Sequence, residues 1–141
     1  MKHALALFAT IFAMFAVFAT PADSLALRRH PRLILHEGAM EVVLRLVESD
    51  DAVARLHGFI ARRADKYLDE PVQKRVMEGR RLLTVSRRIL ERVGYCSYMY
   101  LYTGERKYAD RAEAEMLAAA SFTDWNPSHF LDVAEMTAAL A

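Results

Sequence analysis

The sequence contains a single cysteine, Cys96, among its 141 residues. One thiol cannot form a disulfide within the chain, and it cannot build a metal site made only of cysteines. Glycine and proline are also scarce, with five and four residues, and this composition excludes collagen-like and low-complexity sequences. The length accommodates one globular domain at most.

An excess of charge of one sign is absent as well. The chain has 19 Lys and Arg residues against 18 Asp and Glu. No strong overall field therefore attracts it to nucleic acid or to an anionic membrane, and we predict neither partner for the mature protein. Within this balance the basic residues are strongly skewed, because 15 of them are Arg and only four are Lys.

Residue patterns typical of metal and cofactor sites are missing. His36 and His57 have no ligand spacing with another His, with Cys or with a pair of carboxylates. No glycine-rich phosphate-binding loop occurs. We therefore expect neither a metal ion nor a cofactor.

Only one long hydrophobic run occurs, at residues 4–18, where fifteen residues follow Lys2 and His3 without a charge. Val17 and Ala19 place small residues at positions −3 and −1 of a cleavage site. These are the parts of a secretory signal peptide. A membrane anchor is the alternative, but the run is shorter than the roughly 18 to 20 residues that a spanning helix needs.

We therefore predict a signal peptide over residues 1–19, with cleavage as late as residue 22. The mature protein is then periplasmic or secreted, and it uses no disulfide. Pro21 directly after the apolar run also argues against a continuous spanning helix.

From residue 37 onward, apolar residues recur at intervals of three and four, which is typical of amphipathic helices. The first helix begins at Glu37 and is broken at residues 49–51, which also offer an N-cap to the second helix. The second helix ends before Pro71. Residues 71–83 are basic and irregular, and Gly79 indicates a bend within them.

Three further helices follow in the sequence. Thr84 or Ser86 is expected to cap the third helix, and Gly104 supplies the left-handed conformation that ends it. The fourth helix covers residues 105–120. Asn126 is expected to cap the fifth, with proline at its first position. The residues expected on the apolar faces are Met40, Val43, Leu44 and Val47; Val53, Leu56, Ile60, Ala64 and Leu68; Ile89, Val93, Cys96 and Tyr100; Tyr108, Ala112, Met116 and Ala120; and Val133, Met136 and Leu140.

The pattern predicts an all-α fold of about five helices. We expect the apolar face of the fifth helix to have no following element that covers it. Two architectures remain open, a small self-contained bundle and the first part of a larger helical array. We favour the array.

Cys96 lies on an apolar stripe, so we expect its thiol to be buried and unreactive.

Four segments of the mature chain carry longer motifs, and the last of them is the most specific. They are HPRLIL at 30–35, GRRLLTVSR at 79–87, YMYLYTGERKYADRA at 98–112 and WNPSHFLDVAEMT at 125–137. In this order the motifs resemble the heparinase II/III-like polysaccharide lyases. The resemblance implies that residues 24–141 form the N-terminal part of an (α/α) toroid. It also implies β-elimination of uronic-acid polysaccharides such as heparin, heparan sulfate or alginate.

Members of that family are several-fold longer than this chain. Their segment that neutralises the uronate carboxylate, and their catalytic tyrosine, lie beyond the point that corresponds to residue 141. We therefore assign no catalytic residue here, and we expect the isolated chain to be inactive. The alternative is a non-catalytic periplasmic helical-repeat module that binds a glycan or a protein.

The segment that opens the fifth helix is the first candidate surface. A helix start carries a partial positive charge, which suits the carboxylate or sulfate of an anionic polysaccharide. Trp125 can stack on a sugar ring, and Asn126 serves first as a cap. His129 faces either the glycan or the core. Asp132 and Glu135 orient an arginine or a histidine, or are simply solvated.

A basic cluster is the second candidate surface. It comprises Arg80, Arg81, Arg87, Arg88 and Arg92. Guanidinium groups bind sulfate and carboxylate groups in a bidentate manner, which suits an anionic sugar chain. The alternative is an ordinary charged face whose arginines pair with Glu78 and Glu91.

The first prediction concerns export. When the chain is expressed in a Gram-negative host, the periplasmic fraction should contain a protein that begins at Thr20 or Asp23. N-terminal sequencing or intact-mass measurement checks this. An intact form that begins at Met1 and stays in the inner membrane would contradict it.

Overall fold

The structure is a computed structural model, and it describes residue 35 and residues 38–141. All regular elements in this part are helices, so the all-α prediction is confirmed for it. The predicted signal peptide and nearly all of the motif at 30–35 lie outside the described residues. The helices are α2 (Ala39–Ser49), α3 (Asp51–Asp69), α4 (Leu83–Thr103), α5 (Arg106–Ala120) and α6 (Phe130–Leu140).

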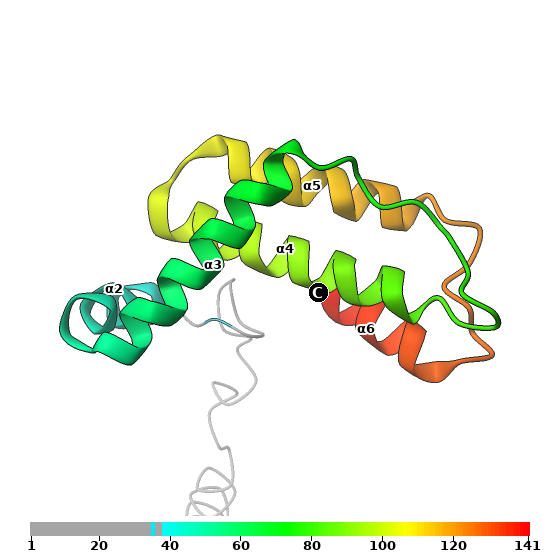
Figure 1. The fold of residues 1–141 in the computed structure, drawn as a ribbon, viewed down its shortest axis with the longest axis horizontal. Helices are drawn as coiled ribbons and strands as arrows, with labels where there is room; N and C mark the ends of the chain where they lie inside the picture. The colour runs from blue at the N-terminus through cyan, green and yellow to red at the C-terminus, as the bar shows by residue number, and fades with distance from the viewer. Residues whose placement is uncertain (1–34, 36–37) are drawn as a thin grey trace, which may run out of the picture.

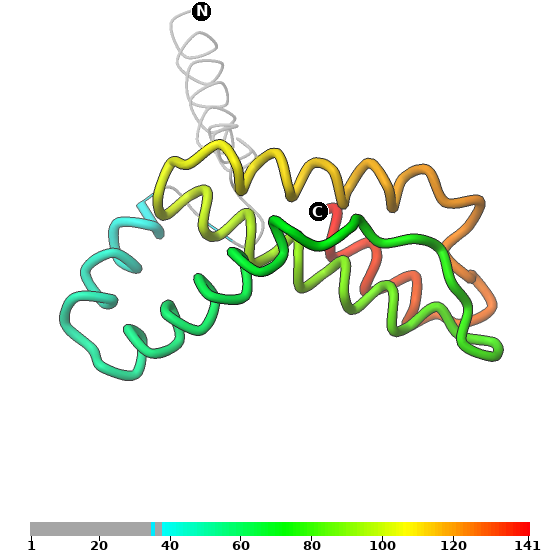
Figure 2. Tube along the Cα trace, turned by 45° about the horizontal axis from the view of Figure 1, so that its top comes forward, coloured from blue at the N-terminus to red at the C-terminus, as the bar shows by residue number. Residues whose placement is uncertain are grey.

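Helix α4 is the centre of the fold (Figure 1). Helix α5 returns along it, α6 packs beside its N-terminal half, and α3 crosses its C-terminal half. Helices α2 and α3 form a hairpin that extends away from the other helices (Figure 2). No helix in the described part combines the length and the apolar character that crossing a membrane requires.

Two of the predicted helix ends are confirmed. The Asp50 carboxylate caps α3, because its Oδ1 accepts from the N–H groups of Ala52 (2.8 Å) and Val53 (3.1 Å). Gly104 ends α4 with a positive φ of 74°, and its N–H donates to the backbone oxygen of Tyr100 at 2.8 Å. Both ends are encoded by residues that lie next to them in sequence.

Two of the predicted N-caps are wrong. Leu82, rather than Thr84 or Ser86, occupies the N-cap position of α4, and His129 rather than Asn126 occupies that of α6. Neither N-cap residue makes a side-chain cap bond. The polar side chains near both starts bond instead to other segments of the chain.

Two apolar clusters lie along α4. The first joins its N-terminal half to α5 and α6, and the second joins its C-terminal half to α3 and α5. Burial of each large side chain contributes about 1.5–3 kcal/mol to stability. The first cluster contains Leu82, Val85, Ile89, Val93, Ala119, Met136 and Ala139, and the second contains Ala64, Tyr67, Cys96, Met99, Tyr108 and Ala112.

The predicted apolar faces are correct only in part. Helix α2 buries no residue, and Leu56 of α3 is 58% exposed. In α4 the buried position is Met99, while Tyr100 is 39% exposed. The expectation that the fifth helix has no cover is also wrong, because Met136 is fully buried in the cluster that α6 shares with α4 and α5.

Residues 70–82, which we call the strap, connect α3 to α4 without regular secondary structure apart from a short turn near its end. The strap runs along α5 to the far end of α4 (Figure 1). Buried groups of the two helices bind its first residues. Glu115 Oε2 accepts from the N–H of Gln73 at 3.0 Å, and Arg92 Nη1 donates to the backbone oxygen of Pro71 at 2.8 Å.

The same groups form a buried ionic network. Arg92 and Arg111 each donate to Glu115 Oε1 at 2.6 Å, and the carboxylate of Glu115 is fully buried. Arg92 also pairs with the carboxylate of Glu70, and its guanidinium lies over the ring of Tyr67, 5.2 Å from the centroid. Removal of one partner from such a network leaves uncompensated buried charge, which is strongly destabilising.

We therefore expect Glu115→Ala to lower the free energy of unfolding by about 3–5 kcal/mol, because two buried arginines lose their shared carboxylate. Urea denaturation followed by circular dichroism checks this. Glu48→Ala, on the exposed side of α2, is the matched control and should change stability by less than about 0.5 kcal/mol. Equal effects of the two variants would contradict the assigned role of Glu115.

Candidate functional site

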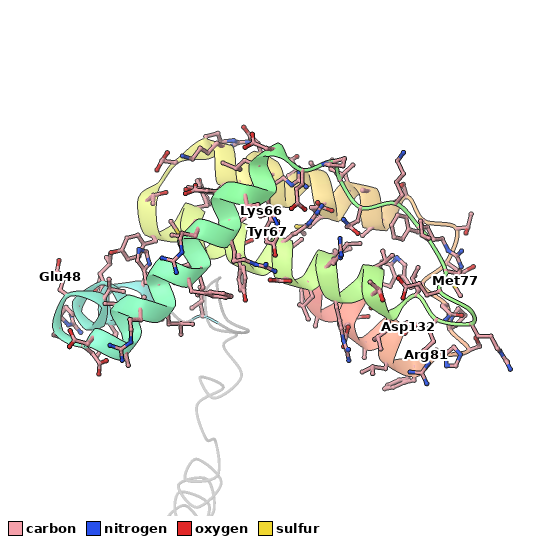
Figure 3. The ribbon with its side chains drawn as sticks, viewed as in Figure 1. Glu48, Lys66, Tyr67, Met77, Arg81 and Asp132 are labelled. Atoms are coloured by element: carbon pink, nitrogen blue, oxygen red, sulfur yellow. The ribbon has the colours of Figure 1, made fainter. Side chains whose placement is uncertain are left out.

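One end of the molecule brings together the end of the strap, the start of α4 and the loop that precedes α6 (Figure 3). Residues 78–81 form a tight turn there, which we call the arginine turn. The N–H of Glu78 donates to the backbone oxygen of Arg81 (2.8 Å), and the reverse bond is 3.1 Å. Gly79 has a φ of +61°, so the predicted bend is confirmed.

The arginine turn is held by a buried carboxylate. Asp132, in the first turn of α6, is fully buried, and its Oδ2 accepts from the N–H of Leu82 at 2.7 Å. The side-chain amide of Asn126 donates to the same oxygen at 2.6 Å, and it also donates to the backbone oxygen of Arg80 at 2.9 Å. Asp132 and Asn126 together fix both the turn and the residue that follows it.

Asn126 is itself held in a left-handed conformation, with a φ of 58° that few residues other than glycine and asparagine adopt. Its N–H donates to Asp124 Oδ1 (2.7 Å), its Oδ1 accepts from the hydroxyl of Ser128 (3.0 Å), and its backbone oxygen accepts from the N–H of His129 (2.9 Å). Asp124 also pairs with Arg75 of the strap at 2.8 Å. The hydrogen bond from Arg75 and, to a smaller extent, that from the N–H of Asn126 lower the pKa of Asp124.

The remaining polar residues of the 125–137 motif are also engaged. The indole N–H of Trp125 donates to the backbone oxygen of Ala119 at 2.9 Å, and the ring packs against the first core cluster. Glu135 accepts from Arg87 Nε at 3.0 Å and from the hydroxyl of Ser86 at 3.3 Å. His129 is half-buried, and its Nε2 has no hydrogen-bond partner within the described residues.

The arginines differ strongly in their surroundings. Arg80 and Arg81 are exposed, and neither takes part in an ion pair with the residues that the structure describes. Arg87 is exposed but is held by Glu135. Arg92 is buried in the ionic network, so it is not part of a surface.

The carboxylates near the basic cluster have partners of their own. Glu78 accepts a hydrogen bond from the hydroxyl of Thr84 at 2.8 Å, and Glu91 pairs with Arg63 at 2.5 Å. Within the described residues, neither carboxylate forms an ion pair with Arg80 or Arg81.

Reactive groups of other kinds lie away from this end. The hydroxyl of Tyr98 is 3.0 Å from His57 Nδ1, on the side of α4 that faces α3. Burial raises the pKa of Tyr67 to about 12 and that of Cys96 to about 11, so both groups are protonated at neutral pH. The expected buried thiol is confirmed. Among the described residues, no cluster of three His, Cys, Asp or Glu side chains is arranged to hold a metal ion.

Six of the eight predicted site residues lie in the arginine turn or in the segment from Trp125 to Asp132. The other two, Arg87 and Glu135, form an ion pair with each other. The sequence did not indicate Arg111 and Glu115. Their signal was present, because both fall at helical spacing among the apolar positions Tyr108, Ala112 and Ala119.

Comparison with known proteins adds no assignment. No protein-family model matches the chain, and no curated protein matches it. The relation to the lyases therefore stays a prediction from the four sequence motifs.

Asp132→Ala should loosen the arginine turn, because it leaves the N–H of Leu82 and the amide of Asn126 without their acceptor. Hydrogen bonds to a charged group contribute about 1.5–3 kcal/mol each. We expect a marked loss of stability and faster trypsin cleavage after Arg80 and Arg81, measured by mass spectrometry under conditions in which the helices remain folded.

Asp69→Ala is the matched control, since this carboxylate is exposed at the end of α3. Its stability should change by less than about 0.5 kcal/mol, and its cleavage pattern should match that of the unmodified chain. Unchanged cleavage of the Asp132→Ala protein at the arginine turn would show that Asp132 does not hold this segment.

Proposed function

We propose that this chain is the anionic-glycan-binding helical part of a secreted uronic-acid polysaccharide lyase, and that its helices belong to an (α/α) toroid. One observation carries the binding role: Arg80 and Arg81 are exposed, and no ion pair within residues 38–141 involves them. The turn that carries them is fixed from beneath by Asp132 and Asn126. The lyase assignment is supported by the order of the four motifs.

The chemistry of the proposed ligand matches this surface. Guanidinium groups offer paired N–H donors, which suit the carboxylates of uronates and the sulfates of heparin-like chains. A ligand gains affinity when the residues that bind it are already ordered. The backbone of the arginine turn meets this condition, because two backbone hydrogen bonds and the contact of Arg80 with Asn126 hold it within the protein.

The proposed roles of the predicted residues follow from their surroundings. Arg80 and Arg81 bind the glycan. Arg87 is paired with Glu135, so this pair adds no net positive charge to the site. Trp125, Asn126 and Asp132 act as positioning residues, because their polar atoms are bonded within the protein. The half-buried ring of His129 lies at the same end of the molecule.

Lyase chemistry requires more than these groups supply. The C5 proton of a uronate is removed only if the carboxylate is neutralised, and this step also needs a base and an acid at one sugar. In the family that the motifs resemble, the neutralising residue and the catalytic tyrosine lie beyond the position of residue 141. We therefore expect no ultraviolet-absorbing unsaturated product when this chain alone is mixed with heparin, heparan sulfate or alginate.

Binding provides the direct test. The double variant Arg80→Ala/Arg81→Ala should bind size-defined heparin oligosaccharides about tenfold more weakly, because each exposed contact is worth about 0.7 kcal/mol. Isothermal titration calorimetry at low salt measures this effect, and binding of the unmodified chain should weaken as the salt concentration rises.

The matched control is Arg55→Ala/Arg62→Ala, which removes the same charge from the exposed side of α3. It should leave the affinity within about twofold of the unmodified chain, apart from the general effect of net charge. Equal loss of affinity in both double variants would indicate unspecific attraction and would contradict the proposed site. Turnover by the isolated chain would contradict the proposed division of roles.

A further inference from the structure

A groove of about 490 Å³ lies open between the C-terminal half of α4 and helix α5. Its lining is mainly apolar and includes Leu117, which is 64% exposed, and Leu101, which is 45% exposed. Both are large hydrophobic side chains. Packing within one chain leaves most of Leu117 and nearly half of Leu101 exposed to water. The groove lies outside the contacts of the arginine turn and is independent of the proposed glycan site.

The α5 side of this groove has a self-complementary order of residues. Arg106 and Glu113 lie seven residues apart, almost in line along the helix, and Ala109 lies between them. If a second α5 packs antiparallel with its centre near Ala109, Arg106 of each copy meets Glu113 of the other. The small side chain of Ala109 allows the two helices to approach closely at the two-fold axis.

The apolar residues complete the same arrangement. Leu117 lies about two turns beyond the centre of this contact, toward the end of α5. In an antiparallel pair it reaches past the start of the other copy's α5, which follows the end of α4 after the turn at Gly104. Leu101, three residues before Gly104 in α4, is exposed and lines the groove. Each Leu117 side chain can therefore pack into the groove of the other copy.

The charges at the groove are available for such a contact. Within one chain Arg106 bonds to Asp110 at 2.6 Å and lies 3.8 Å from Glu113, and all three side chains are well exposed. Exposed pairs of this kind add little to stability, so their exchange for pairs between two copies is not opposed. Asp110 does not line the groove, and its carboxylate accepts from Arg106 of the same chain.

We propose that this face forms a two-fold symmetric homodimer in which α5 packs antiparallel against α5 of a second copy. Such an interface uses the same patch on both subunits, which is why the order of charges along one helix is sufficient to specify it. The opposite charges fix the register, and the leucines supply the apolar burial.

Charge reversal tests the register directly. Arg106→Glu places two glutamates opposite each other at both ends of the contact, and Glu113→Arg places two arginines there. Each single variant should therefore have a dimer dissociation constant at least about tenfold higher than that of the unmodified chain.

An equimolar mixture of the two single variants should form a heterodimer. One copy then carries glutamate at both positions and the other carries arginine at both, so each of the two contacts across the interface joins opposite charges. Sedimentation equilibrium of the purified proteins measures the unmodified chain, the two single variants and their mixture.

The double variant Arg106→Glu/Glu113→Arg should also recover the dimer, because it exchanges the charges and keeps them complementary. Circular dichroism serves as the folding control, since both positions are exposed and helicity should not change. A monomeric unmodified chain at about 100 µM, a concentration well above the dissociation constants of stable dimers, would overturn the proposal. So would single variants that dimerise normally, or a mixture that does not recover association.

Discussion

Two buried carboxylates, those of Glu115 and Asp132, fix the position of the strap. Each accepts from a backbone N–H near one end of this segment, at Gln73 and at Leu82 respectively. A stretch of chain without regular structure must find partners for its buried backbone groups, or it loses the hydrogen bonds that water would provide. The carboxylates supply these partners from α5 and α6. The strap is thereby held against the helices at both ends, and the arginine turn occupies a defined place.

This arrangement separates two roles within one end of the molecule. The polar residues of the 125–137 motif act inside the protein, where Asn126 and Asp132 bond to the backbone of the strap. Arg80 and Arg81 are exposed on the turn that these residues hold. In the proposed function, glycan recognition by arginines on a fixed turn therefore depends on residues that do not touch the glycan. The proposed dimer uses a different face of α4 and α5, so the two proposals stand or fall separately.

The sequence predicted the helices and two of their ends because those signals are local. The carboxylate of Asp50 and the positive φ of Gly104 act on residues within one turn. The burial of Asp132 and Asn126 was not predictable in this way, since their partners lie 46 to 50 residues away. Both residues suit helix starts, and that local preference led to the wrong cap assignment for Asn126. The burial of Glu115 was not predicted, because a charged residue is normally expected on the exposed face of a helix, although Glu115 falls at helical spacing among buried positions.

Amide hydrogen exchange of the strap tests the central claim most directly. The N–H groups of Gln73 and Leu82 should exchange slowly although both lie outside the helices, because buried carboxylates accept their hydrogen bonds. Lys74 and Val76, whose N–H groups have no acceptor within the described residues and whose side chains are exposed, should exchange quickly. Exchange at Gln73 and Leu82 as fast as at Lys74 and Val76 would contradict the account.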